Sequence, residues 1–351
     1  MPTRPRGCKV TTVRRALLIL LLCLLAAVEY RVAIGIDGKR LQLSLSAIEH
    51  LLDGQTHWRV YGGRVLTPLL LRGAMRATGA AALPCLLFLM LALGTATKFA
   101  AWWGLRPLAR SDGEAWAAML ALTLGWLLLH NGQPAYLWDV VDLGLAAVTV
   151  GLLARGGGSV AAWALLLLLA SLNREGAVLL GLAPLIQALT PAGRDLRAAL
   201  LYLALLLTGL GLAFGLREAV FVRATLEQGE GVARAAAGVV HLRLFENLAT
   251  IAEEVLGLLD PARLLALRPL VLLPALVVPF AVVARPRLLW QRAPGLAGLA
   301  LVLLAATLVA GEVMEGRVWT LLLPIDAGLV MVATGGATNT ATRPPVTGGS
   351  R

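Results

Sequence analysis

The side chains able to do chemistry in this chain lie in short polar segments between long apolar ones. The first such segment combines acids and arginines: Asp37, Glu49, Asp53, Arg64, Arg72 and Arg76. A carboxylate can take a proton from a hydroxyl group and so act as a general base. An arginine guanidinium matches the oxygens of a phosphate through two parallel N–H bonds. The segment therefore predicts an anion site with a general base close by.

Three further polar clusters interrupt apolar segments later in the chain. They are Asp139 with Asp142, the sequence Asn173-Arg174-Glu175, and Glu315 with Arg317. Polar groups at membrane depth cost on the order of several kcal/mol unless they are partnered. We therefore expect these clusters to meet the first segment in one cavity at the outer leaflet. The candidate bases are Asp37, Glu49 and Asp142, and the candidate substrate ligands are Arg64, Arg72, Arg76, Asp139, Arg174, Glu175, Glu315 and Arg317.

A structural role is also open for each acid. Glu49 closes the sequence Ser46-Ala-Ile-Glu49, which has the form of a capping box at a helix start. Asp139 and Asp142 lie in a first helical turn, where the helix dipole favours negative charge. Asp37 can be a solvated acid at the end of the first apolar segment. These carboxylates therefore serve either catalysis or helix ends.

The other charged residues have structural interpretations as well. Arg72 and Arg76 can extend along the membrane surface to lipid head groups. The pair Arg174–Glu175 can lock two helix ends by ionic attraction, and Glu315–Arg317 can pack in the same way. The spacing alone leaves both roles open for each pair.

Metal and nucleotide chemistry have little support in this sequence. His50, Asp53 and His57 share a helical face, but Gly54 interrupts the helix between them. We therefore predict no metal site and no cofactor from these residues, while a requirement for a divalent metal stays open. No P-loop, G-x-G-x-x-G, G-x-S-x-G or H-E-x-x-H sequence is present, so ATP-driven and hydrolase chemistry have no motif behind them.

The composition identifies the elements that must position these residues. Of 351 residues 58% are hydrophobic and only 15% are charged, which excludes both an ordinary soluble domain and a disordered chain. The excess of 31 bases over 20 acids lies in turns between apolar segments, as membrane topology requires, and does not indicate nucleic-acid binding. The bases are mostly arginine, which with abundant Ala, Leu and Gly is typical of a GC-rich bacterial genome.

The apolar segments are long enough to form about ten membrane spans. We place the spans at 16–36, 81–103, 115–131, 139–154, 159–172, 176–190, 198–216, 269–284, 294–311 and 318–334. With the N-terminus inside, the inner segments hold sixteen bases, Lys98 among them, against three acids. This bias predicts a single all-α transmembrane domain over residues 1–334 with both termini in the cytoplasm. The first span is predicted to be retained rather than cleaved as a signal peptide, and 335–351 form a disordered cytoplasmic tail.

Two segments, 37–80 and 217–268, are too polar to span and are predicted to be external. The first reads as two short helices: one follows the capping box, and one is capped by Thr67, carries Pro68 at its first position and ends at Gly79. Arg72 and Arg76 share one face of that second helix, so we expect it to lie in the membrane interface. The second segment contains an amphipathic run around 242–259.

Three short motifs resemble those of a group of uncharacterised bacterial multispan membrane proteins. They are Tyr61-Gly-Gly-Arg64-Val-Leu-Thr-Pro68, Asn173-Arg174-Glu175 and Glu315-Gly-Arg317, although Gly176 stands where many of that group have a threonine. The layout also resembles the C-type glycosyltransferases, which have interfacial helices and acids soon after the first span. That resemblance implies a sugar donor linked to a polyprenyl phosphate, an acceptor outside the bacterial cytoplasmic (inner) membrane, and inversion at the sugar.

Two other classes of function compete with a glycosyltransferase. A transporter or flippase of lipid-linked or small anionic cargo would use the same arginines, and a non-enzymatic membrane scaffold would leave the outer charges unexplained. For an enzyme we expect the charged clusters to converge in a closed outer cavity. For a transporter we expect them on a path through the middle of the membrane.

Overall fold

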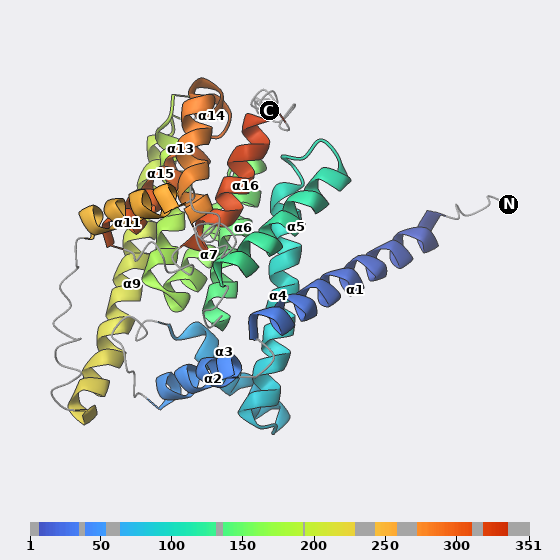
Figure 1. Cartoon of the computed structure of the whole chain (residues 1–351), viewed down its shortest axis with the longest axis vertical. Helices are drawn as coiled ribbons and strands as arrows, with labels where there is room; N and C mark the ends of the chain where they lie inside the picture. Colours follow the sequence, from blue (N-terminus) through green and yellow to red (C-terminus); the bar gives the residue numbers. More distant parts are fainter. Residues whose placement is uncertain are drawn as a thin grey trace, which may run out of the picture.

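The structure is a computed structural model that describes residues 7–34, 39–53, 64–130, 136–191, 194–228, 243–257, 272–310 and 319–335 (Figure 1). Every regular element in these ranges is a helix, which confirms the all-α class. Most helices pack into one bundle, while α1 runs out from it at an angle and α2 and α3 lie at the end where α4 begins (Figure 1).

All ten segments predicted to span are helical within these ranges, with edges shifted by a few residues. The elements are α1 (Gly7–Ile34), α4 (Ala82–Leu105), α5 (Asp112–Leu129), α6 (Leu137–Ala154), α7 (Val160–Asn173), η2 (Glu175–Gly181) with α8 (Leu182–Leu189), α9 (Leu196–Gln228), α13 (Leu273–Ala284), α15 (Pro294–Ala310) and α16 (Leu322–Ala333). Long apolar runs form helices in this way because lipid offers no partner to a free backbone N–H or C=O.

Fewer of these helices reach the length of a full span. Within the part of the chain that the structure describes, α4, α5, α6 and the segment 196–216 of α9 are long and apolar enough to cross a membrane. The helices α14 (Pro286–Arg292) and α15 follow each other with a bend of 115° between their axes. If this bent pair counts as one span, it is the fifth. The chain is therefore a helical membrane protein by the length and composition of these helices. The helix α14 was not predicted.

The central pair of the bundle is α4 and α6, which approach closely through glycines. A Cβ atom at Gly104 of α4 would meet the backbone carbonyl of Ala147 in α6, and one at Gly151 of α6 would meet the ring of Trp103. The two helix backbones therefore lie nearer to each other than larger side chains allow. This contact fixes where the start of α6 lies relative to α4.

A second hydrophobic core holds α2 (Lys39–Leu52) and α3 (Leu66–Thr78) against the first half of α4 and the start of α6. Ile48 of α2 and Leu71 of α3 are fully buried there. Leu45, Ile48 and Leu52 form one apolar stripe along α2, and this stripe packs on the second core. It attaches both short helices to the bundle.

The predicted starts of these two helices are wrong. The helix α2 begins at Lys39, so Ser46 and Glu49 lie inside it and form no capping box; the apolar periodicity already starts at Leu41, which packs on the same core. The helix α3 begins at Leu66, after Val65, which makes no side-chain cap. Thr67 is therefore a buried first-turn residue rather than a cap.

The predicted end of α3 is confirmed. Gly79 takes a left-handed conformation with φ of +68°, and its N–H donates to the carbonyl of Met75 at 2.8 Å. Only glycine adopts this conformation at little cost, and the bond satisfies one of the free carbonyls at the helix end. The chain then turns directly into α4.

The later external segment contains more helix than expected. The helix α9 continues to Gln228, beyond the predicted end at residue 216, and α11 (Leu244–Gly257) matches the predicted amphipathic run.

Lys98 does not belong to the inner loops, which corrects the charge assignment. It lies within α4 and forms an ion pair with Glu29 of α1; the two side chains are 3% and 4% exposed. A charged residue within an apolar helix is costly unless paired. The pairing partner on another helix explains why Lys98 is tolerated there.

Candidate functional site

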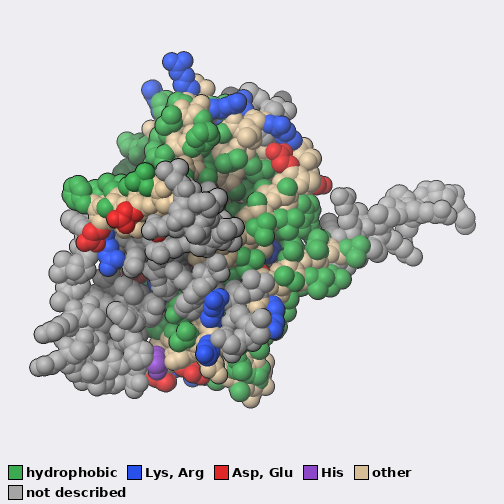
Figure 2. Space-filling model, in the orientation of Figure 1, with side chains coloured by type: hydrophobic (Ala, Val, Ile, Leu, Met, Phe, Trp, Pro, Cys, Tyr) green, Lys and Arg blue, Asp and Glu red, His purple; other side chains and the backbone are tan. Residues whose placement is uncertain are grey.

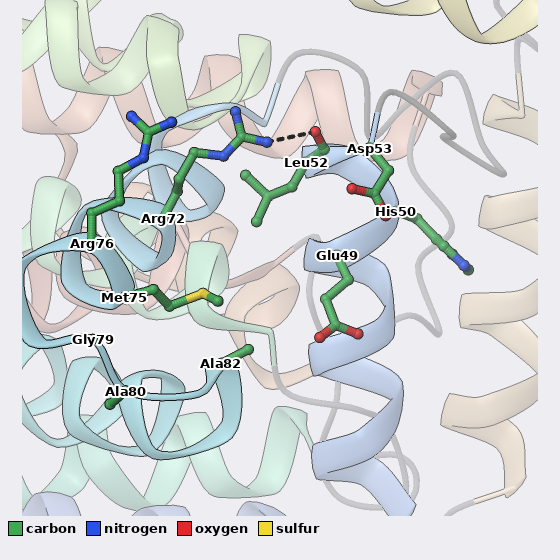
Figure 3. Close-up of a pocket in the computed structure, with 10 residues that line it drawn as sticks. All are labelled: Glu49, His50, Leu52, Asp53, Arg72, Met75, Arg76, Gly79, Ala80 and Ala82. Carbon is green, nitrogen blue, oxygen red and sulfur yellow. Dashed lines mark hydrogen bonds between the residues drawn. The ribbon is translucent and has the colours of Figure 1, made fainter.

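The pocket of interest lies between α2, α3 and the start of α4 and has a volume of about 910 Å³ (Figure 3). Its lining combines apolar, acidic and basic side chains. The lining residues are Glu49, His50, Leu52, Asp53, Arg72, Met75, Arg76, Gly79, Ala80 and Ala82. Four of the acids and arginines proposed from the sequence thus face one space.

The two arginines stand one helical turn apart on α3, and both line the pocket (Figure 3). Arg72 Nη2 donates a hydrogen bond of 2.8 Å to the carbonyl of Leu52. That carbonyl is among the last of α2 and has no partner within its own helix. Among the described residues, the side chain of Arg76 forms no hydrogen bond or ion pair. One guanidinium is therefore oriented by the protein, and the other is available to a ligand.

The two carboxylates come from the last turn of α2 and from the residue that follows it. Glu49 and Asp53 are four residues apart and exposed, and within the described ranges neither carboxylate is paired. Glu49 points toward the segment that joins α3 to α4, and Met75 and Leu52 extend into the space between the two helices (Figure 3). The acids and arginines thus share a pocket without neutralising each other, which leaves both charges for a ligand.

A second group of charged residues is buried where α6 begins. Arg174 Nε lies 2.8 Å from Asp142 Oδ2, and its Nη1 lies 3.7 Å from Asp139 Oδ1. Asn173 Nδ2 donates to Asp142 Oδ1 at 2.7 Å and to the carbonyl of Trp138 at 2.9 Å. Both aspartates are fully buried. We call Arg64, His130, Asp139, Asp142, Asn173 and Arg174 the buried cluster.

Aromatic rings complete this cluster. His130 Nε2 lies 3.8 Å from Asp139 Oδ2, and the ring of His130 stacks on Trp126 at 4.3 Å. Arg64, just before α3, lies over the ring of Trp138 at 4.9 Å from its centroid. The cation–π contact ties the start of α3 to the start of α6. The buried cluster therefore holds the helix that carries the pocket arginines.

Among the described residues, the predicted site residues lie in two places, the pocket and the buried cluster. The pocket lining contains Glu49, Arg72 and Arg76 but no member of the buried cluster. Both oxygens of Asp142 are engaged by Arg174 and Asn173. A general base must reach a substrate hydroxyl, so this geometry favours a positioning role for Asp142.

Several predicted site residues lie outside the described residues. They are Asp37, Glu315 and Arg317, together with the first three residues of the Tyr61–Pro68 motif. Glu175 is described: it begins η2 and attracts Arg174 electrostatically.

Sequence reasoning missed two contributors, His130 and the Lys98–Glu29 pair. The Lys98–Glu29 pair could have been predicted in part, because a lysine within an apolar span requires a buried partner. Tyr30, next to Glu29, contacts Trp126 edge-on at 6.4 Å, and Trp126 stacks on His130. The ion pair is thereby connected to the buried cluster, a link that no sequence spacing indicates.

No group of three or more His, Cys, Asp or Glu side chains able to hold a metal ion occurs within the described ranges. Comparisons of the chain with protein-family models, with curated proteins and with solved structures give no match. The functional interpretation therefore depends on the geometry of the pocket and the buried cluster.

Proposed function

We propose that this protein is a membrane glycosyltransferase of C-type layout that moves a sugar from a polyprenyl-phosphate donor to an acceptor outside the bacterial cytoplasmic membrane. The observation that carries the proposal is the pocket between α2 and α3, where unpaired carboxylates and two arginines face one space. Arginine binds a phosphate leaving group, and a carboxylate takes the acceptor proton. Both groups are present within one pocket.

In the proposed reaction Arg72 and Arg76 bind the phosphate of the donor. The acceptor oxygen forms a bond to the anomeric carbon while the bond from that carbon to the phosphate oxygen breaks. The electron pair leaves with the phosphate, whose charge the guanidinium groups stabilise. Glu49 takes the proton of the acceptor hydroxyl, and Asp53, directly after the end of α2, is the next acid along the chain. A single displacement of this kind inverts the sugar configuration.

The surface of α3 supports access from the lipid. Leu69 is 54% exposed and lies one turn before Arg72 on the same side of the helix. An exposed leucine beside two arginines suits a donor whose chain stays in the membrane while its phosphate reaches the pocket. The interfacial position of α3 is part of the proposal.

The proposed orientation has ten spans with both termini in the cytoplasm and the pocket outside. Without Lys98, the inner segments still hold fifteen bases against three acids, and such a bias sets topology. With Cys8, Cys23 and Cys85 replaced by alanine, single cysteines at two exposed positions test this orientation: Ala77→Cys on α3 should react with an impermeant maleimide in intact cells, and Arg287→Cys on α14 should not. If only Arg287→Cys were labelled, the protein would have the opposite orientation, with the pocket on the cytoplasmic side.

The experiment for the activity uses purified protein in lipid nanodiscs and a fluorescent polyprenyl phosphate. Arg72→Lys with Arg76→Lys keeps the charge but removes the paired N–H donors, so binding should weaken. Glu49→Gln should bind normally and lose transfer to an acceptor by about 10²–10⁴-fold. Arg287→Lys, an exposed arginine on α14, is the matched control. Unchanged binding by the double lysine variant would refute the pocket as the donor site.

A transporter of the same class of lipid is the second candidate. It is favoured by the charges within the helices, since Glu29, Lys98, Asp139 and Asp142 are all buried. A transporter moves the fluorescent lipid between leaflets of a vesicle without changing it. Movement without transfer would favour this candidate, whereas transfer without movement would favour the enzyme.

A further inference from the structure

The helix α11 buries two polar side chains against the protein and exposes several large apolar ones. Asn247 and Glu254 are 4% and 8% exposed, whereas Phe245 and Leu256 are 84% and 66% exposed. In a water-soluble protein the opposite arrangement would hold. The reversal calls for an apolar environment on the outer side of α11.

The attachment of α11 to the bundle uses the end of α15. The backbone N–H of Arg243 donates to the carbonyl of Val309 at 2.8 Å, and Asn247 Nδ2 donates to the carbonyl of Leu308 at 2.8 Å. These carbonyls belong to the last turn of α15, where no intrahelical donor is left. The polar side of α11 therefore completes the hydrogen bonds of an apolar helix at the point where that helix ends.

The outward side of α11 is a continuous apolar sector. At the spacing of an α-helix its exposed apolar residues fall within roughly 120° of the helix circumference. They are Phe245, Leu248, Ala249, Ala252, Val255 and Leu256. Glu246 and Glu253 lie together along one edge of this sector and are exposed. Figure 2 shows hydrophobic side chains beside acidic ones at the position of α11.

We propose that α11 lies in the membrane interface with this sector inserted among lipid acyl chains. Its 14 residues give a length of roughly 21 Å, which is too short to cross a hydrocarbon core of about 30 Å. Figure 1 shows α11 at the side of the bundle, running across the direction of α9. A helix that caps the end of an apolar helix lies where hydrocarbon gives way to head groups. There the apolar sector reaches acyl chains, and the two glutamates at its edge reach water.

The test uses the full chain with Cys8, Cys23 and Cys85 replaced by alanine, and one new cysteine that carries the fluorophore NBD. Phe245→Cys and Leu256→Cys place the probe in the apolar sector, and Glu246→Cys is the matched control on its edge. The labelled proteins are reconstituted in phosphatidylcholine vesicles. Only variants that elute from size-exclusion chromatography at the same volume as the parent protein are compared.

A nitroxide on the lipid acyl chains should remove a larger share of the emission at positions 245 and 256 than at 246, and aqueous iodide should do the reverse. Quenching of all three positions by iodide alone would place α11 in water and overturn the proposal. Protection from both quenchers, with energy transfer between labelled copies, would show that a second copy of the chain covers the sector. That outcome also overturns it. The result does not depend on the proposed enzyme activity.

Discussion

Replacement of Lys98 by methionine leaves the carboxylate of Glu29 without its ion-pair partner inside the protein. The two side chains are 3% and 4% exposed, so water cannot compensate for the lost partner. Removal of one member of a buried pair typically costs about 3–5 kcal/mol of folding free energy, because the remaining charge stays desolvated. We expect Lys98→Met and Glu29→Gln each to lower stability by about this amount.

The double variant Glu29→Gln with Lys98→Met should be much more stable than the sum of the two changes. Independent effects would add to about 6–10 kcal/mol, whereas replacing both charges of a buried pair by groups of similar size is often close to neutral. We therefore expect a coupling energy of roughly 5 kcal/mol or more between the two sites. A coupling of this size requires direct contact between the two side chains.

Unfolding in mixed micelles with increasing SDS, followed by tryptophan emission, measures these differences. The control is the pair Arg106–Asp112, whose side chains are 40% and 49% exposed. Because water screens an exposed pair, Arg106→Met should cost less than about 1 kcal/mol. If Lys98→Met unfolds at the same SDS fraction as Arg106→Met, the buried ion pair between α1 and α4 is refuted.

Three further predictions concern packing and buried hydrogen bonds. Gly104→Ala should destabilise the α4–α6 contact by about 1–3 kcal/mol, since its Cβ would meet the Ala147 carbonyl; Gly73→Ala, with open space around it, should not, and thermal unfolding in detergent separates the two. Asn173→Ala should cost about 1–3 kcal/mol because it removes the donor to Asp142 and to the Trp138 carbonyl, and equal melting temperatures for variant and parent would contradict it. Asn247→Ala should speed amide hydrogen exchange throughout α11, because it leaves the Leu308 carbonyl without its donor; unchanged exchange in α11 would show that the bond does not anchor it.

The sequence determined which segments are helical and which are too polar to span. The predicted spans coincide with helices because the length and hydropathy of a segment are local properties. The end of α3 followed from a single glycine, Gly79, and the shared face of Arg72 and Arg76 followed from their spacing of four residues. Each of these properties depends on residues within one or two helical turns.

The role of Glu49 shows where local reasoning fails. Ser46 and Glu49 have the spacing of a capping box, yet α2 starts seven residues before Ser46. The stripe that includes Leu41 packs on the second core, and this burial extends the helix through the apparent cap. Tertiary packing overrides local propensity in this way because a buried apolar stripe contributes more than one cap. Glu49 is thereby placed at the pocket.

Only the tertiary structure decided which charges meet. Helical periodicity tells which side of a helix a residue occupies, but it does not tell which helix lies opposite. Lys98 meets Glu29 because α1 packs on α4, and Arg174 meets Asp139 and Asp142 because the turn after α7 lies against the start of α6. The same packing buries the acids of α6 and leaves those of α2 exposed at the pocket. Burial and pairing arise from contacts between segments distant in the chain, so the sequence supplied the charged residues and the packing divided them between the pocket and the buried cluster.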